Sequence, residues 1–298
     1  MTTSAAQPSS ATATGEGGER YFEDFAVGQR FTSATREVTQ RDPEAFTEIS
    51  GDAHPLHTDP SYAATTRFAR PVLQGPFGIA VVAGLFHDLA VVDSTVIAML
   101  DTHWRYLQPI HVGDTLHFEM TITRCRRSSS GDRGVVNRHV ALIDQHGQRV
   151  QEGTTAVLVQ ARETRDPSED PVGCAFGTAA WGEALARRLE ADREFGSATA
   201  SWDGTFGLRC GEDEVHLRVY RGRVLEATRR APLGATFTVE ADELTWTELL
   251  TGPRNDFTHR AMRGQFRTRG SGYDYLRFTK ALTVLVDNAR SLATEETR

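Results

Sequence analysis

Residues 49–59, ISGDAHPLHTD, place one carboxylate and two imidazoles around a proline. Pro55 fixes its own backbone dihedral angle and pushes His54 toward an extended conformation, so Asp52 and His57 are expected on a rigid bend. A carboxylate beside a neutral imidazole can hold one water molecule and exchange protons with it near neutral pH, which contributes about 10²- to 10⁴-fold to a rate. The segment therefore predicts general acid–base chemistry on a water molecule.

A purely structural role is the alternative for the same side chains. An aspartate at position 52 can cap a short helix such as residues 60–69, PSYAATTRFA, and a loop histidine can be an ordinary polar residue. The combination of all three groups in one short segment favours the chemical role over the structural one.

The segments around this loop predict the framework that positions it. A short helix through Phe46 is expected to end near Gly51. After the loop, Gly75 and Pro76 precede residues 77–90, FGIAVVAGLFHDLA, which are apolar on nearly every side, as expected for a helix surrounded by a sheet. A helix N-terminus presents unpaired N–H groups, and because proline has no N–H, Gly75 is the natural donor to an anionic oxygen.

The rest of this half has strand character. Apolar and polar residues alternate between 116 and 122, and residues 144–147, DQHG, are typical of a hairpin turn. For residues 19–160 the pattern predicts one long helix held by a curved antiparallel sheet.

The second half has its own pattern. Residues 161–177 contain two prolines and mixed charges and are expected to be a linker. Residues 178–298 begin with an amphipathic helix over 178–194, continue in alternating strands and end in a long helix over 273–293. Helices on one face of an antiparallel sheet are expected there, so the predicted fold class of the whole chain is α+β. Residues 1–18, mostly small and polar, are expected to be a disordered tail.

The composition excludes several classes of protein. The formal net charge of −7 provides no broad basic surface for nucleic acid or an anionic membrane, and no apolar run is long enough to cross a bilayer. Cys125, Cys174 and Cys210 lack metal-ligand spacing, so neither a disulfide framework nor a zinc site is expected. These features predict a cytoplasmic protein that needs no metal or other cofactor.

The motif SGDxxPLHxD, followed by a glycine that precedes an apolar helix, resembles the hydratase-2 motif of the MaoC-like hotdog dehydratases, the (R)-specific enoyl-CoA hydratases. The resemblance covers about residues 20–160 and includes YFEDFAVGQRF at 21–31, RPVLQGPFGIAVVAGLF at 70–86 and HWRYLQPIHVGDTL at 103–116. It implies a hotdog fold and the reversible hydration of an unsaturated acyl thioester.

By this resemblance Asp52 and His57 are the catalytic acid–base pair, and the backbone amide of Gly75 is the donor to the thioester oxygen. Which member of the pair faces the water and which serves the α-carbon stays open, since two such groups can titrate as a coupled unit. Removal of one preorganised donor of the Gly75 kind costs on the order of 3 kcal/mol in barrier height.

Two positions depart from the family pattern. The family usually has asparagine where His54 stands, and commonly histidine where Gln74 precedes the glycine. An imidazole at position 54 can still donate one hydrogen bond and accept another. The resemblance leads us to expect substrate contacts from His54, Gln74, Phe77 and Trp104.

Residues 178–293 resemble the sterol-carrier-protein domain, notably in ADELTWTELL at 241–250 and RGQFRTRGS at 263–271. In that family helices cover a sheet and leave an apolar tunnel for acyl chains or sterols. The alternative is that the same aromatic residues simply form a core. The candidate walls of a lipid pocket are Trp202, Trp246, Phe266 and Phe278.

The first hypothesis for the chain is a lyase that hydrates or dehydrates an α,β-unsaturated or 3-hydroxy acyl thioester of coenzyme A or a carrier protein. A close variant adds an internal hydroxyl of a biosynthetic intermediate instead of water. A lipid-binding protein with an idle hotdog domain and a thioesterase are the alternatives. A lone hotdog domain leaves an exposed sheet edge, so a homodimer through this domain is expected.

Overall fold

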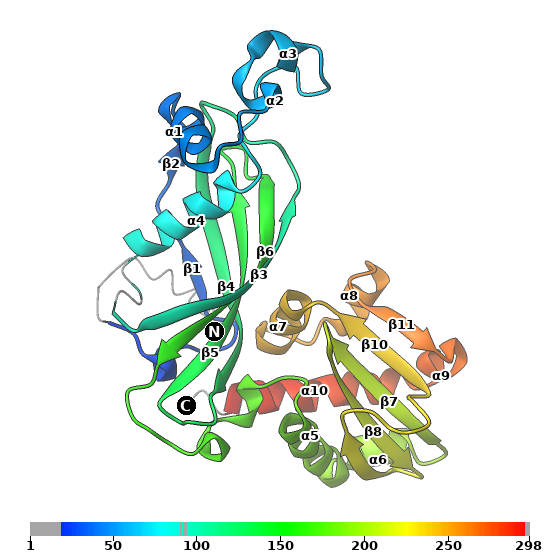
Figure 1. Ribbon diagram of the computed structural model, residues 1–298. Helices are drawn as coiled ribbons and strands as arrows, with labels where there is room; N and C mark the ends of the chain where they lie inside the picture. The colour runs from blue at the N-terminus through cyan, green and yellow to red at the C-terminus, as the bar shows by residue number, and fades with distance from the viewer. Residues whose placement is uncertain (1–18, 90, 92–93, 296–298) are drawn as a thin grey trace, which may run out of the picture.

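The computed structural model describes residues 19–89, 91 and 94–295 (Figure 1). Two hydrophobic cores organise this part of the chain, one within residues 22–161 and the other within residues 172–293. The fold is α+β in both halves, as predicted. The tail expected at residues 1–18 lies outside the described residues.

The N-terminal core rests on a curved antiparallel sheet with the strand order β1-β4-β5-β6-β3, in which β2 also pairs with β4. Inward residues of β4 at 116, 118, 120 and 122 are at most 2% exposed, so the predicted alternation is confirmed. The turn predicted at 144–147 is also present, because Gly147 N–H donates to the carbonyl of Asp144. The strands are β1 (Arg30–Thr32), β2 (Arg36–Glu37), β3 (Val96–Tyr106), β4 (Thr115–Arg127), β5 (Arg133–Ile143) and β6 (Arg149–Gln160).

Helix α4 (Phe77–Asp88) lies against this sheet, the arrangement expected of a hotdog domain (Figure 1). Its buried residues are Phe77, Gly78, Val81 and Leu85. The opposite face of the helix, at positions 80, 83, 84 and 87, is exposed in the single chain. The sheet of one chain covers only one side of the helix.

Three short helices carry the chain from β2 to α4 and project beyond one end of the sheet (Figure 1). They are α1 (Arg41–Ser50), α2 (Pro55–Thr58) and α3 (Pro60–Ala64), and a 3-10 turn, η1 (Phe22–Asp24), precedes the sheet. The helix predicted over 60–69 is shorter than expected. It ends at Ala64, and Ala69 adopts a positive φ of 61° that a helix does not allow.

The C-terminal sheet has the strand order β11-β10-β7-β8-β9. Its pairs are antiparallel, as predicted, except β7 with β10, which are parallel. After β9 at one edge the chain crosses the sheet and enters β10 beside β7 in the same direction. The strands are β7 (Asp203–Cys210), β8 (Asp213–Tyr220), β9 (Arg223–Thr228), β10 (Phe237–Ala241) and β11 (Arg267–Gly270).

The helix predicted over 178–194 is present as α5, with Thr178 as its N-cap and Trp181, Leu185 and Leu189 fully buried. The predicted last helix is divided in two at Phe278, the C-cap of α9. The longer part, α10, packs against α5, α6 and α7. The helices are α5 (Ala179–Ala191), α6 (Arg193–Ala198), α7 (Glu243–Thr251), α8 (Phe257–Met262), α9 (Gly272–Arg277) and α10 (Thr279–Glu295).

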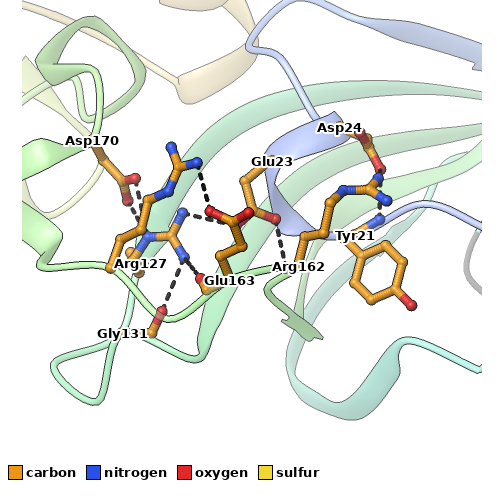
Figure 2. Close-up of polar contacts among 9 residues, drawn as sticks. Tyr21, Glu23, Asp24, Arg127, Gly131, Arg162, Glu163 and Asp170 are labelled. Atoms are coloured by element: carbon orange, nitrogen blue, oxygen red, sulfur yellow. Dashed lines mark hydrogen bonds and ion pairs between the residues drawn. The ribbon is translucent and has the colours of Figure 1, made fainter.

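Residues 161–177, expected as a linker, contain two 3-10 turns, η2 (Pro167–Glu169) and η3 (Val172–Cys174). Arg127 of β4 ties this segment to the N-terminal domain (Figure 2). Its guanidinium, 1% exposed, donates to Asp170 at 2.9 and 3.0 Å and to Glu23 at 3.1 Å. It also donates to the carbonyls of Gly131 and Glu163.

A second arginine of β4 joins the two domains. Arg124 donates to Asp213 at 2.6 Å and lies 3.3 Å from a carboxylate oxygen of Glu243. The hydroxyl of Thr123 donates to Glu243 at 2.9 Å. Since the side chain of Arg124 is only 12% exposed, these bonds form a largely buried polar seam between the domains.

Candidate active site

The loop between α1 and α2 is built by its own sequence. Gly51 ends α1 in the left-handed region, with φ at 72°, which a glycine adopts without strain. Pro55 begins α2, and the Nδ1 atom of His54 accepts the N–H of Leu56 at 3.1 Å as an N-cap. The predicted bend between Asp52 and His57 therefore consists of a helix end followed at once by a helix start.

Asp52 and His57 face each other across this bend. The Nε2 atom of His57 lies 3.7 Å from Oδ2 of Asp52. Nδ1 of His57 lies 2.7 Å from the carbonyl oxygen of Val72, an acceptor, so this nitrogen carries the proton in the neutral imidazole. Nε2 is then an acceptor. The separation is too long for a direct hydrogen bond, and one water oxygen can contact both atoms.

The start of α4 lies beside this pair. Gln74, buried at 1% exposure, donates from Nε2 to the backbone carbonyl of Asp52 at 3.0 Å and to Oγ1 of Thr47 at 2.9 Å. The N–H of the next residue, Gly75, donates to no acceptor within the described residues. Val72 and Gln74 thus fix the positions of His57 and Asp52 relative to the next residue, Gly75, whose amide is unpaired.

A residue that the sequence analysis missed supports this amide from the sheet. Gln151 of β6, 3% exposed, donates from Nε2 to the carbonyl of Gly75 at 3.0 Å and accepts from the indole N–H of Trp104 at 2.7 Å. A Cβ at Gly78 would collide with the Gln151 side chain, so glycine is required there for this approach. β6 carries other polar side chains as well, including the buried Glu152 and Thr155, so no local signal in the sequence distinguished Gln151.

The residues expected at the substrate lie in different surroundings. His54 is exposed and caps α2, while Phe77 is buried and packs edge-on against Phe46 with ring centroids 5.8 Å apart. Gln74 anchors the loop, and its Oε1 atom has no hydrogen-bond partner within the described residues. Trp104 alone among these four lines a cavity described below.

Two cavities border predicted site residues. One of about 260 Å³ borders His57, with Arg70 and His111 among its walls. A second of about 140 Å³ lies beneath α4 and is lined by Trp104. A third of about 630 Å³ lies between the domains, has charged walls such as Arg149, Glu152, Arg209 and Arg269, and contains none of the predicted site residues.

The aromatic residues expected to line a lipid pocket are packed in the C-terminal core. Trp202 and Phe278 have ring centroids 4.6 Å apart, and Trp246 and Phe266 have centroids 4.8 Å apart. All four are at most 6% exposed. Trp246 borders a void of about 10 Å³, smaller than an acyl chain needs. A lipid pocket with these walls stays a prediction.

Within the described residues, no cluster of three or more His, Cys, Asp or Glu side chains could hold a metal ion. No helix in this part of the chain combines the length and apolar character needed to span a bilayer. Burial raises the pKa of the Cys210 thiol to about 12, so this thiol is protonated near neutral pH.

The fold and the site define an α+β protein whose hotdog domain holds an Asp/His pair beside the start of its helix. Residues 24–143 match the family model described as MaoC like domain, and the chain carries a MaoC-like domain over this range. Protein MaoC of Klebsiella aerogenes is 34% identical over 106 residues, which are 35% of this chain and 31% of that protein. The chain thus spans less than a third of the length of this relative.

Other relatives and solved structures are similar to part of the chain. An (R)-specific enoyl-CoA hydratase of Aeromonas caviae is 27% identical over 45% of this chain and 96% of its own length. A mesaconyl-CoA hydratase of Cereibacter sphaeroides is 26% identical over 51% of this chain and 44% of that protein. A solved MaoC-like dehydratase from Rhodospirillum rubrum is 28% identical over 48% of this chain and 99% of that one, with a TM-score of 0.44. A crystal structure of sterol carrier protein 2 is 26% identical over 39% of this chain and 97% of that one, with a TM-score of 0.35.

Proposed function

We propose that the N-terminal domain adds water to an α,β-unsaturated acyl thioester of coenzyme A or a carrier protein, or removes water from the 3-hydroxy form. Relatives named for the hydration or dehydration of CoA thioesters support the reaction class. The observation that carries the proposal is the pair of acceptors, Oδ2 of Asp52 and Nε2 of His57, 3.7 Å apart at a position tied to the start of α4.

The two acceptors account for the proton movements. A water molecule between them can donate one hydrogen to each, which directs an oxygen lone pair outward toward the β-carbon. As the carbon–oxygen bond forms, the pair takes a proton from this water and a proton is delivered to the α-carbon, so the pair ends as it began. Elimination follows the same steps in reverse. The division of labour between Asp52 and His57 is left open.

The amide of Gly75 supplies the electrophilic element of this mechanism. Its N–H is unpaired within the described residues, and it stands where the dipole of α4 is positive. A thioester oxygen that gains negative charge during addition is stabilised there. Gln151, bonded to the carbonyl of the same residue, sets the orientation of this peptide group.

Incubation with crotonyl-CoA and longer enoyl thioesters tests the proposal directly, with loss of the conjugated absorbance as the readout. The product is to be identified as the 3-hydroxyacyl thioester, and release of a free thiol is measured in parallel. Thiol release without hydration would indicate a thioesterase and would contradict the proposal.

We further propose that the active form is a homodimer joined at β3. Among the described strands β3 is the edge of its sheet and pairs only with β6, and it exposes Ile97, Met99 and Leu100 at 42 to 55%. An apolar strand edge with unpaired N–H and C=O groups is a surface that a second copy can cover by pairing in the same way. The proposed dimer interface is supported by the location of these three exposed apolar side chains on one edge strand.

A further inference from the structure

Arg138 of β5 stands in the row of residues that points into the N-terminal core. Its row neighbours at 134, 136, 140 and 142 are glycine, valine, valine and leucine, all buried, and Arg138 itself is 6% exposed. Nε donates to the hydroxyl of Thr155 at 2.7 Å, and Nη1 lies 3.9 Å from the sulfur of Met120. The guanidinium carbon lies 4.2 Å from the centroid of the Phe86 ring.

No carboxylate pairs with this guanidinium within the described residues. Two arginines of β4 with little exposed surface differ in this respect. Arg124 forms ion pairs with Asp213 and Glu243, and Arg127 forms ion pairs with Glu23 and Asp170. Burial lowers the pKa of Arg138 to about 10, so it still carries its charge near neutral pH. A buried, uncompensated cation is costly to a fold, so its presence requires a reason outside folding.

Arg138 is among the residues that line the cavity of about 140 Å³ beneath α4. The other walls are mainly apolar and include Ile79, Val82, Ala83 and Phe86, which lie on one side of α4 at helical spacing. The cavity is about as large as one that admits benzene, enough for roughly six carbon atoms. A cavity with one cation in apolar walls suits a chain that is apolar along its length and anionic at its end.

Two hydrogen bonds connect a wall of this cavity to the peptide group of the proposed catalytic amide. Trp104 lines the cavity and donates to Gln151, which in turn bonds to the carbonyl of Gly75. Along α4, the distance from Gly75 to Phe86, on which Arg138 stacks, is roughly 16 Å at about 1.5 Å per residue. A chain that begins at the Gly75 amide can therefore extend along the helix toward Arg138.

We propose that the cavity beneath α4 receives an acyl chain that ends in a carboxylate, and that Arg138 binds this carboxylate. The inference rests on the proposed hydratase function and names its substrate class, ω-carboxyacyl thioesters. From the helix rise and the reach of an extended chain, the fitting length is roughly eight to ten carbons. A four-carbon diacid is too short to span from Gly75 to Arg138.

The test compares two enoyl-CoA substrates of equal length, trans-2-decenoyl-CoA and the same chain with a terminal carboxylate. For the wild-type protein we expect kcat/KM to be at least about tenfold higher for the carboxylate-ended chain. In Arg138→Met this preference is expected to vanish through a higher KM, while hydration of the plain chain is kept. Arg126→Met, a change at an exposed arginine on β4, is the matched control and keeps the preference.

A binding measurement separates this inference from the catalytic proposal. Octanedioate is expected to raise the Tm of the wild type and of Arg126→Met, and to leave Arg138→Met unchanged, whereas 1-octanol, which has no carboxylate, raises none of them to the same extent. Binding of octanedioate without any hydration would support the Arg138 site and reject the hydratase. Equal hydration of both chains, with no effect of octanedioate, would overturn the Arg138 site and leave the hydratase standing.

The variant itself is expected to fold. Replacing an unpaired buried cation by a similar-sized apolar side chain is neutral or stabilising in many proteins, so the Tm of Arg138→Met should be equal to or above that of the wild type. Arg138→Gln, which can keep a hydrogen bond to Thr155, provides the same comparison if the methionine variant loses its structure.

Discussion

Gln74 donates a hydrogen bond to the backbone carbonyl of Asp52, 22 positions earlier in the chain, and so joins the acid of the proposed pair to the start of α4. Val72 holds His57 in the same way through its carbonyl. The segment at 72–75 therefore sets three groups at once: a carboxylate, an imidazole and an unpaired amide.

Asp52→Asn and His57→Gln are each expected to lower kcat for crotonyl-CoA hydration by about 10²- to 10⁴-fold, because each replaces a group that can take up a proton by an amide that cannot. Steady-state rates measured from the conjugated absorbance check this. Glu48→Gln, the loss of an exposed carboxylate on the neighbouring α1, is the control and should keep the wild-type rate. Wild-type rates in both test variants would show that the pair is idle.

Gln151→Leu is expected to lower kcat by roughly tenfold with a smaller change in KM, since one buried hydrogen bond to the Gly75 peptide is lost. Trp104→Phe, which removes only the outer hydrogen bond to Gln151, should cost less, and the two losses should not add because they act through one side chain. Gln148→Leu, at an exposed turn position, is the control. A change confined to KM would argue for a binding role instead.

Ile97→Arg combined with Leu100→Arg is expected to convert the homodimer to a monomer, because two cations would then face their copies across the β3 edge. Light scattering at micromolar concentration measures this directly. Leu225→Arg on β9 changes an apolar side chain that is 57% exposed and should leave the mass unchanged. A wild-type protein that is already monomeric would refute the proposed interface.

Arg127→Met should lower the free energy of unfolding by about 3 kcal/mol, since the change strands Glu23 and Asp170 without their cation. Urea titration followed by tryptophan fluorescence checks this value. Arg133→Met removes an arginine that is 41% exposed on β5 and should cost less than about 1 kcal/mol. Equal losses in the two variants would mean that the ion pairs of Arg127 with Glu23 and Asp170 contribute little to the free energy of unfolding.

Acid should weaken the ion pair between Arg127 and Glu23. Burial alone would raise the pKa of Glu23, but the backbone N–H of Arg162 and then the guanidinium of Arg127 outweigh burial and hold the pKa below its ordinary 4.5. A carboxyl with a depressed folded-state pKa contributes stability that is full above pH 4.5 and is lost as the pH falls through the folded-state pKa. Urea midpoints between pH 7 and pH 3 should therefore fall less steeply in Glu23→Gln than in the wild type.

The control for the acid series is Glu212→Gln, whose side chain is 99% exposed. Its midpoints should follow the wild type across the whole range. If Glu23→Gln also followed the wild type, Glu23 would not contribute to the acid dependence of stability.

Local patterns in the sequence determined much of the fold. The alternation between 116 and 122 predicted β4, the turn residues at 144–147 predicted the hairpin, and Trp181, Leu185 and Leu189 predicted the buried face of α5. These elements could be predicted because their signals lie within a few residues of one another. The parallel pairing of β7 with β10 could not, because it depends on how the chain crosses the sheet between distant strands.

For the candidate site, Pro55, Gly51 and the spacing of Asp52 and His57 already specify a bend that carries a carboxylate and an imidazole. Only the tertiary structure decided what surrounds that bend. Gln151 and Arg138 act on the helix from strands more than fifty residues away, and the role of a side chain at such a distance depends on strand register and packing, which no local pattern contains.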